Sequence, residues 1–328
     1  MKQFIIFLLV FVSAFSYADT VRRACFDIGS GTTKMVVADV DTVKHTIEIV
    51  YEDNAKVDYK GDLESSADNC FSPAILEKGL QALNELAQKA HQQGAKQFAG
   101  VATAAFRTSD NGKEFLEQIE DKLGICVSII SQKEEAEMGF MAACQGEENK
   151  DIAVWDIGGG SMQISCYDKN KEFQIYEGQF ASNNMKTFLI NLKGIPNLTT
   201  PNPVGKKNTI AALKHVKELA NQVTPEMKEA LKNAKVIGIG GVHYYSVCPQ
   251  INKELNKKEK SYTVDELKET IKKRYNKTNE EIGGEYADTE VGNLLLVFGY
   301  MKTLGIQQVQ TKKINMAHGL LCYEKLWK

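Results

Sequence analysis

The chain has 328 residues, of which 43% are hydrophobic and 25% are charged, and its formal net charge is −2. These proportions are those of an ordinary globular protein, and the length is sufficient for two domains with sizeable cores. Because the chain carries no basic excess, we expect no nucleic acid partner, and a polyanionic substrate would have to be bound at a local site.

Residues 1–18 predict a secretory signal peptide. Lys2 precedes an apolar run over residues 4–15, and Ser16 and Ala18 place small side chains just before a cleavage site. An uncleaved anchor is the alternative, although the run is short for a membrane span. We therefore expect a mature periplasmic or secreted chain that begins at Asp19 and has no membrane partner after cleavage.

The first predicted domain covers residues 19–132. Two strands are expected within residues 24–38, a third over 44–51, and an exposed loop over 52–71. Ser72 and Pro73 then indicate a helix start, followed by apolar residues at helical spacing. Helices at 73–92, 110–123 and 132–144 alternate with strands at 97–103 and 126–130. The predicted order is βββαβαβα.

The second predicted domain covers residues 133–312 and repeats this order with longer insertions. Strands are expected at 152–155, 162–167, 172–176, 235–239 and 308–310. Helices are expected at 181–192, 208–223, 264–275 and 290–304. A last helix over 316–328 is assigned, with the segment 313–328, to the first domain. Seven cysteines are present, and Cys248 and Cys322 are candidates for a disulfide.

Two similar glycine-rich turns stand out in the chain. Residues 24–38 read ACFDIGSGTTKMVVA, and residues 152–165 read IAVWDIGGGSMQIS. Consecutive glycines are costly on folding, but they allow main-chain N–H groups to approach an anion closely. Either turn alone would fit an ordinary hairpin. Their repetition predicts two similar domains that face each other, with Asp27 and Asp156 beside a phosphate and a hard cation.

Three further stretches complete the pattern: GVATAAFR at 100–107, IISQKEEA at 129–136 and IGIGGVHYYSV at 237–247. With the two turns, they resemble the exopolyphosphatase / guanosine pentaphosphate phosphatase (Ppx/GppA) family of the actin-like ATPase superfamily. The resemblance implies an α/β fold of two actin-like (ribonuclease H-like) βββαβαβα domains facing across a cleft. It also implies an enzyme that releases terminal phosphate from polyphosphate or (p)ppGpp-like nucleotides with Mg²⁺.

The resemblance also assigns roles to residues. The family's general base falls on Glu135, and its phosphate-binding arginine falls on Arg107. The magnesium site falls on Asp27, Asp156 and Gln163. Phosphate contacts fall on Gly29, Ser30, Gly31, Thr32, Gly158, Gly159, Gly160 and Ser161. Without the resemblance, Glu134 and Glu135 would be read as complementing a helix dipole, and Arg107 as a surface ion-pair residue.

Some residues depart from the family pattern. Gly31 and Thr32 replace an Asn-Ser pair, Gln163 stands where the family has glutamate, and Lys34 stands where arginine or histidine is common. Gln163 in GGSMQ and the stretches ATAAFR, EEA and GVHYY are similar to secreted apyrases. This likeness implies that Tyr244 and Tyr245 would stack on a nucleobase. They would otherwise be core tyrosines of a helix.

Three readings therefore remain open: a Ppx/GppA-type hydrolase, an apyrase-like nucleoside tri- or diphosphate hydrolase, and a non-catalytic sensor of polyphosphate or nucleotide. In each of them the partner is a small anionic phosphate compound. The sequence also leaves open whether the chain forms a homodimer.

Overall fold

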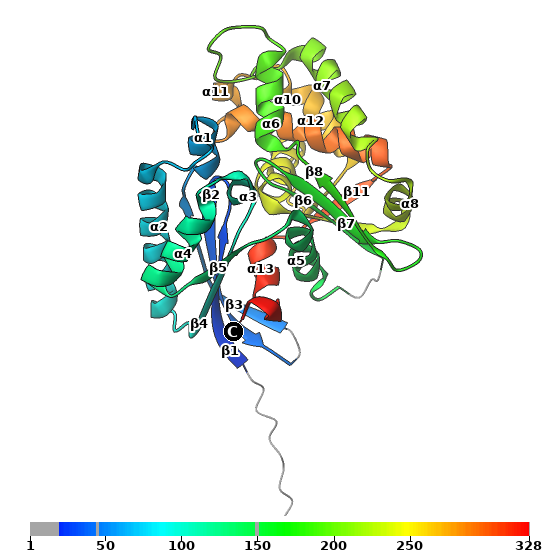
Figure 1. Ribbon diagram of the computed structural model, residues 1–328. Coiled ribbons are helices and arrows are strands. Elements are labelled where there is room, and N and C mark those ends of the chain that lie inside the picture. The colour runs from blue at the N-terminus through cyan, green and yellow to red at the C-terminus, as the bar shows by residue number, and fades with distance from the viewer. Residues whose placement is uncertain (1–19, 44–45, 148–150, 328) are drawn as a thin grey trace, which may run out of the picture.

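The computed structural model describes residues 20–43, 46–147 and 151–327, and it contains two mixed sheets with helices packed against them (Figure 1). The predicted signal peptide lies outside the described residues. Within the described ranges, no helix combines the length and the apolarity that a membrane crossing requires.

The first sheet has five strands in the order β3-β2-β1-β4-β5. The strands are β1 (Thr20–Ile28), β2 (Thr32–Asp41), β3 (Thr46–Lys56), β4 (Gln97–Ala102) and β5 (Cys126–Ile129). The first three pair antiparallel through short connections, whereas β4 and β5 join in parallel through helical crossovers. The carboxyl end of β1 therefore lies beside that of β4, which positions the loops that follow them.

The described part of the first half of the chain contains five helices: α1 (Tyr59–Glu64), α2 (Pro73–Gln92), α3 (Ala104–Thr108), α4 (Gly112–Leu123) and α5 (Gln132–Cys144). Helix α2 begins as predicted, because the Ser72 side chain accepts a hydrogen bond from the Ile75 N–H. It packs Leu83 and Leu86 into the core of the first sheet.

Two short helices of this half were not predicted. Helix α1 lies inside the expected loop 52–71, and α3, which contains Arg107, lies between the expected strand 97–103 and the expected helix 110–123. Helices of one or two turns are not stable by themselves, so tertiary packing has to hold them. In α1 that packing comes from Tyr59, which is fully buried with its ring against Phe71 and Phe106.

The second sheet has six strands in the order β10-β11-β9-β6-β7-β8. The strands are β6 (Ile152–Ile157), β7 (Met162–Tyr167), β8 (Phe173–Gly178), β9 (Lys235–Ile239), β10 (Ser261–Thr263) and β11 (Gln308–Thr311). As in the first sheet, three antiparallel strands are followed by parallel ones, with the short β10 added at the edge. The repeated topology confirms the predicted α/β fold of two actin-like domains.

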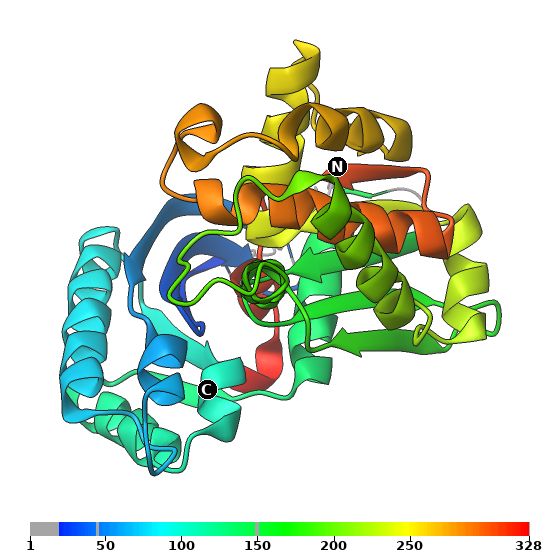
Figure 2. The same cartoon turned by 90° about the horizontal axis from the view of Figure 1, so that it is seen from above.

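Helices cover the second sheet on the side drawn at the top of Figure 1 and seen from above in Figure 2. They are α6 (Ser182–Asn191), α7 (Gly205–Ala220), α8 (Pro225–Asn233), the π-helix η1 (Val242–Val247), α9 (Cys248–Leu255), α10 (Val264–Arg274), α11 (Asn279–Ile282) and α12 (Ala287–Leu304). Helix α12 is apolar on most of its surface because α6, α7 and α10 surround it. The sequence did not predict α8, α9, α11 or β10.

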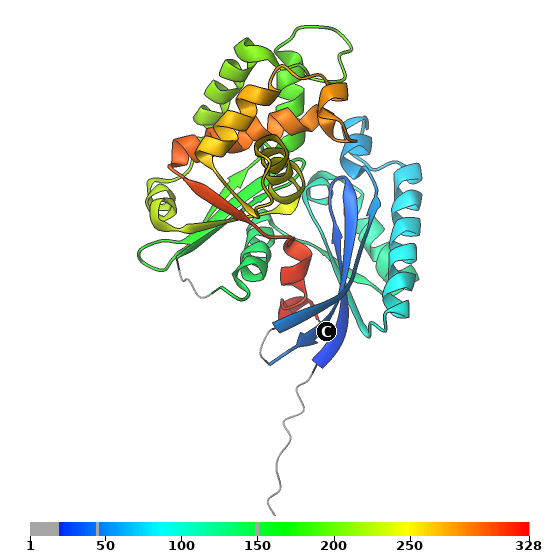
Figure 3. The same ribbon diagram turned by 180° about the vertical axis from the view of Figure 1, so that it is seen from behind.

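The chain end packs against the first sheet, as Figure 3 shows from behind. The predicted helix 316–328 is wrong in length, since α13 covers only Met316–Leu320 and a 3₁₀ turn follows at Glu324–Leu326. The buried Arg23 guanidinium donates to the Leu321 carbonyl and pairs with Glu324, which diverts this segment from a helical path. Met316 and Leu320 pack with Cys25 and Val36 in one buried cluster.

No disulfide joins Cys248 to Cys322, so this predicted pairing is wrong. The reason is placement. Cys248 donates to the Glu259 carbonyl beside the second sheet, whereas Cys322 packs in the cluster between α13 and the first sheet.

Candidate active site

The two glycine-rich turns have the same hydrogen-bonding pattern. In the first turn, the Gly29 N–H donates to the Thr32 carbonyl at 3.1 Å, and in the second the Gly158 N–H donates to the Ser161 carbonyl at 3.0 Å. Each turn closes a hairpin, β1–β2 or β6–β7, immediately after an aspartate. The repeat seen in the sequence is therefore a repeat in backbone geometry.

The carbonyl groups of both turns are bonded to neighbouring segments. The Lys60 N–H donates to the Ser30 carbonyl at 2.9 Å, and the Asn183 N–H donates to the Gly159 carbonyl at 2.8 Å. No described residue accepts a hydrogen bond from the N–H groups of Ser30, Gly31, Gly159 or Gly160. With their carbonyls occupied and these N–H groups available, both turns are suited to bind an anion.

Each aspartate faces one particular side chain on the opposite strand. Asp27 lies opposite Lys34 in the β1–β2 register, and Asp156 lies opposite Gln163 in the β6–β7 register. The Lys34 ammonium is 3.1 Å from a carboxylate oxygen of the buried Asp27. Duplicated positions therefore carry a lysine in one half and an uncharged amide in the other.

The two aspartates lie close enough for their charges to interact, as expected for two turns that face each other. Burial raises the pKa of Asp156 to about 6, the Lys34 charge opposes this rise, and the Asp27 charge adds to it. The pKa of Lys34 is raised chiefly by Asp27, and Asp156 and Glu135 raise it further. One lysine thus faces three carboxylates at the junction of the two halves.

Glu135 and Arg107 meet beside these carboxylates. An Arg107 guanidinium nitrogen is 3.2 Å from a Glu135 carboxylate oxygen and donates to the Ile130 carbonyl at 2.9 Å. Burial nevertheless raises the pKa of Glu135 to about 7, because it outweighs the attraction of Arg107. A carboxylate with a pKa near neutrality is suited to exchange a proton with water.

The neighbouring Glu134 has a structural role. Its carboxylate accepts hydrogen bonds from the N–H and the hydroxyl of Ser131, and it forms the capping box of α5. These bonds lower the pKa of Glu134. Of the two glutamates at the start of α5, Glu134 therefore caps the helix, and Glu135 faces the cluster of charges.

The donor set around Asp27 and Asp156 fits magnesium. The Asp27 charge adds to the raised pKa of Asp156, a repulsion that a bound cation would relieve, and Gln163, buried beside Asp156, adds an amide oxygen. The amide nitrogen of Gln163 has no hydrogen-bond partner among the described residues. Oxygen ligands of this kind, completed by water, are those that Mg²⁺ prefers. Lys34 competes for the same carboxylates.

Tyr244 and Tyr245 lie on η1, the π-helix that follows β9. They line a pocket of about 250 Å³ with Cys248, Pro249 and other residues, none of which belongs to either turn. The Tyr245 side chain is 64% exposed, and the two rings meet edge to face at 4.9 Å. The larger pocket, of about 580 Å³, lies beside β9 and β11 and contains none of the predicted site residues.

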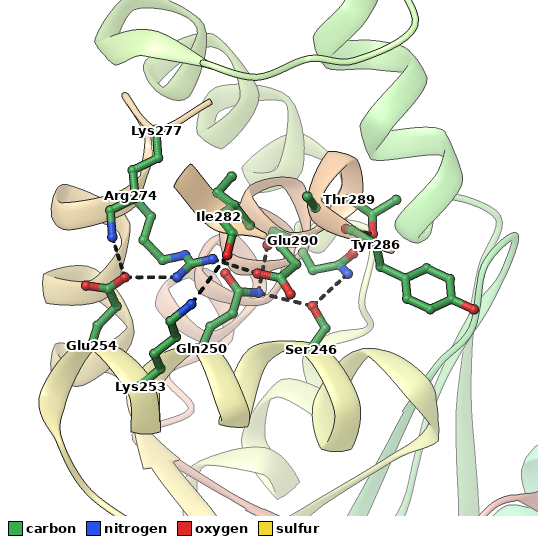
Figure 4. A network of polar contacts seen from close by, with 12 residues as sticks. Ser246, Gln250, Lys253, Glu254, Arg274, Lys277, Ile282, Tyr286, Thr289 and Glu290 are labelled. Atoms are coloured by element: carbon green, nitrogen blue, oxygen red, sulfur yellow. Dashed lines mark hydrogen bonds and ion pairs between the residues drawn. The ribbon is translucent and has the colours of Figure 1, made fainter. Parts of the chain in front are cut away.

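A network of buried and half-buried polar groups holds the helical segment that carries these tyrosines (Figure 4). The Ser246 hydroxyl accepts bonds from Gln250 and from Asn293 of α12. Nearby, Arg274 forms ion pairs with Glu254 of α9 and Glu290 of α12, at 2.9 and 2.6 Å. These contacts fix η1 and α9 against the surrounding helices, so the two tyrosines are carried on a rigid support.

Three residues at the site were missed by the sequence analysis. Lys60 and Asn183 approach the second turn from α1 and α6, and Gly240 leaves room for Asp156. A Cβ atom at Gly240 would lie 2.2 Å from an Asp156 carboxylate oxygen. The glycine pair Gly240-Gly241 after β9 was a usable signal for this contact. No sequence signal pointed to Lys60 or Asn183. Lys60 lies in a polar stretch, and Asn183 lies at a helix start that has no capping residue in the sequence.

Solved structures of other proteins share the fold of this chain. A crystal structure of the Aquifex aeolicus member of the Ppx/GppA family superposes with a TM-score of 0.74 at 17% identity, covering 94% of this chain and 98% of that one. An exopolyphosphatase structure from Cytophaga hutchinsonii gives 0.72 at 18% identity, covering 93% and 97%. At these identities, the two superpositions establish the shared fold.

The family itself is established by sequence. The profile of the Ppx/GppA phosphatase family matches residues 36–326, which is most of the chain and includes Arg107, Glu135, Asp156 and the second turn. This chain therefore belongs to the Ppx/GppA phosphatase family and is a hydrolase of phosphoanhydrides.

Proposed function

We propose that this protein releases the terminal phosphate of polyphosphate or of a (p)ppGpp-like nucleotide, with Glu135 activating the attacking water. The observation that carries the proposal is the placement of Glu135. It is a buried carboxylate with a pKa of about 7, paired with Arg107 and acted on by the charges of Asp27 and Asp156. The two anion-binding turns lie beside these aspartates, one after each.

The chemistry divides among the groups as follows. The terminal phosphoryl group is bound by N–H groups of the first turn and by Arg107, whose charge-assisted hydrogen bonds serve both binding and the transition state. A water oxygen attacks phosphorus while its proton passes to Glu135, and the bridging P–O bond breaks toward the departing phosphate chain. Positioning and charge stabilisation supply most of the rate.

Asp27, Asp156 and Gln163 would hold Mg²⁺. When bound, the ion neutralises charge that develops on the phosphate oxygens. Lys34 supports the same charge balance from this chain's own residues, because its ammonium already lies 3.1 Å from Asp27. The Lys34 charge also opposes the rise in the pKa of Asp156 and so favours the ionised form of this carboxyl, which a cation would bind.

An apyrase-like activity on nucleotides is the second candidate. It is favoured by the uncharged Gln163 and by Tyr245, an aromatic side chain that is 64% exposed at the edge of a pocket. Stacking of a nucleobase on such a ring would add affinity that polyphosphate cannot gain.

We also propose that the protein is exported and begins at Asp19. The support is the amino-terminal pattern of Lys2, an apolar run and small residues before position 19. N-terminal sequencing of the protein recovered outside the cytoplasm tests this, and a retained Met1 would contradict it.

Phosphate release from a panel of compounds tests the activity. Polyphosphate, guanosine pentaphosphate, GTP, ATP and ADP are each incubated with the purified protein, with Mg²⁺ and with EDTA. We expect release from polyphosphate or guanosine pentaphosphate that depends on Mg²⁺. Release only from ATP, GTP and ADP would establish the apyrase-like alternative. Binding of these compounds without phosphate release from any of them would refute the enzymatic activity and would favour a non-catalytic sensor.

A further inference from the structure

The second glycine-rich turn is flanked by two side chains that reach it from opposite halves of the protein. A Cβ atom placed at Gly160 would lie 3.1 Å from the Lys60 ammonium, and one placed at Gly159 would lie 3.1 Å from the Asn183 side-chain nitrogen. Lys60 belongs to α1 beside the first sheet, and Asn183 belongs to α6 beside the second. Both are hydrogen-bond donors at the tip of one turn.

Backbone contacts fix Lys60 in this place. Its N–H donates to the Ser30 carbonyl of the first turn, and the neighbouring Val57 N–H donates to the Gly31 carbonyl at 3.2 Å. The backbone of Lys60 is therefore bonded to the first turn, while its side chain reaches the second turn. Figures 1 and 3 both show α1 next to the part of the second half that contains α11, and the ion pair of Lys56 with Glu285 joins the same two regions.

The ammonium of Lys60 is available for an anionic ligand. Its ion-pair partner among the described residues is Glu64, at 3.7 Å and four residues along α1, with the Glu64 side chain 67% exposed. Exposed pairs of this kind contribute little stability, so exchanging Glu64 for a phosphate oxygen costs little. The Asn183 amide is likewise exposed at the start of α6.

We infer that Lys60, Asn183 and the N–H groups of Gly159 and Gly160 form a subsite for the second phosphate of the substrate, next to the terminal phosphate that Arg107 binds. This inference rests on the proposed function. Glu135 and Arg107 act at one position, among Asp27 and Asp156. Lys60 and Asn183 gather instead around the tip of the second turn. Lys60 therefore selects substrates with at least two linked phosphates.

Binding of methylenediphosphonate tests this subsite, because its P–C–P bridge resists hydrolysis. Affinities for methylenediphosphonate and for orthophosphate are measured by calorimetry on the full chain. Lys60→Met keeps the aliphatic stem and removes the charge. We expect about tenfold weaker binding of the diphosphonate, as for loss of one charge-assisted hydrogen bond, and less than about twofold change for orthophosphate. Asn183→Ala should weaken the diphosphonate selectively as well, and Lys60→Arg should largely restore it.

Lys113→Met is the matched control. Lys113 also pairs with a glutamate four residues later on an exposed helix, so the same charge is removed outside the site. Unchanged diphosphonate affinity in Lys60→Met would overturn the inference, as would equal loss in Lys113→Met or equal weakening of both ligands in Lys60→Met. If no compound of the hydrolysis panel releases phosphate, the proposed enzymatic activity is refuted. The binding comparison would still test the subsite, because it does not depend on hydrolysis.

Discussion

Replacing Glu135 by glutamine should make the protein more stable at alkaline pH. Burial raises the pKa of this carboxyl from 4.5 to about 7, so the folded state holds the proton more tightly than the unfolded chain does. Stability is therefore lost as pH rises from 4.5 through 7 and stays low above that range. At about 1.4 kcal/mol per pKa unit, the ionised carboxylate costs about 3 kcal/mol at pH 8.

Glu135→Gln removes this cost while keeping the shape of the side chain. We expect its free energy of unfolding to exceed that of the unchanged protein by up to about 3 kcal/mol at pH 8, and by almost nothing at pH 4, where the carboxyl is protonated in both states. Urea unfolding at the two pH values measures the difference.

Glu134→Gln is the matched control for this experiment, with the opposite sign. Its carboxylate accepts two hydrogen bonds from Ser131, which lower its pKa. Loss of this charged cap should destabilise the protein at pH 8 by about 1 kcal/mol, and the effect should fade as pH falls. A Glu135→Gln protein that is less stable at pH 8, or whose gain is the same at pH 4, would refute the reasoning.

Three other outcomes follow from the site and the packing. If Glu135 is the base, kcat/KM should rise with pH through about 7 and then level, and a rate that falls between pH 6 and 8 would contradict this. Gln163→Glu should lower the Mg²⁺ concentration for half-maximal activity by adding a carboxylate to the site, whereas lost activity without tighter Mg²⁺ would favour the apyrase-like reading. Gly319→Ala should cost about 1–3 kcal/mol in urea unfolding, because its Cβ would lie 1.9 Å from the Met138 carbonyl oxygen. Gly241→Ala, with open space at that position, should leave stability unchanged, and equal loss in both would contradict the packing account.

Sequence reasoning succeeded where local pattern and tertiary structure agree. The two strand–turn–strand units were predictable because aspartate, glycines and alternating apolar residues recur in the same order. The start of α2 was predictable because Ser72 and Pro73 form a local cap. The interaction of Asp27 with Asp156 was expected from the repeat, since equivalent turns of two facing domains point toward each other.

The elements and contacts that the sequence did not predict have a common physical cause. Helices α1 and α3 are too short to leave a periodic pattern, and α1 exists because Tyr59 is buried among aromatic rings from distant segments. The early end of α13 depends on Arg23, almost 300 residues earlier in the chain. For the same reason, the approach of Lys60 to Gly160 was invisible in sequence, because it depends on how the two halves meet.

The turnover of Glu135→Gln on the preferred substrate tests the central claim most directly. Phosphate release is measured under saturating substrate and Mg²⁺, beside Glu134→Gln as the neighbouring control and with methylenediphosphonate affinity as the check on binding. General-base assistance is worth roughly 10²–10⁴-fold in rate. We predict a loss of about that size in Glu135→Gln, with unchanged binding and near-normal turnover in Glu134→Gln. Unchanged turnover in Glu135→Gln, or equal losses in both variants, would contradict the assignment of Glu135 as the base.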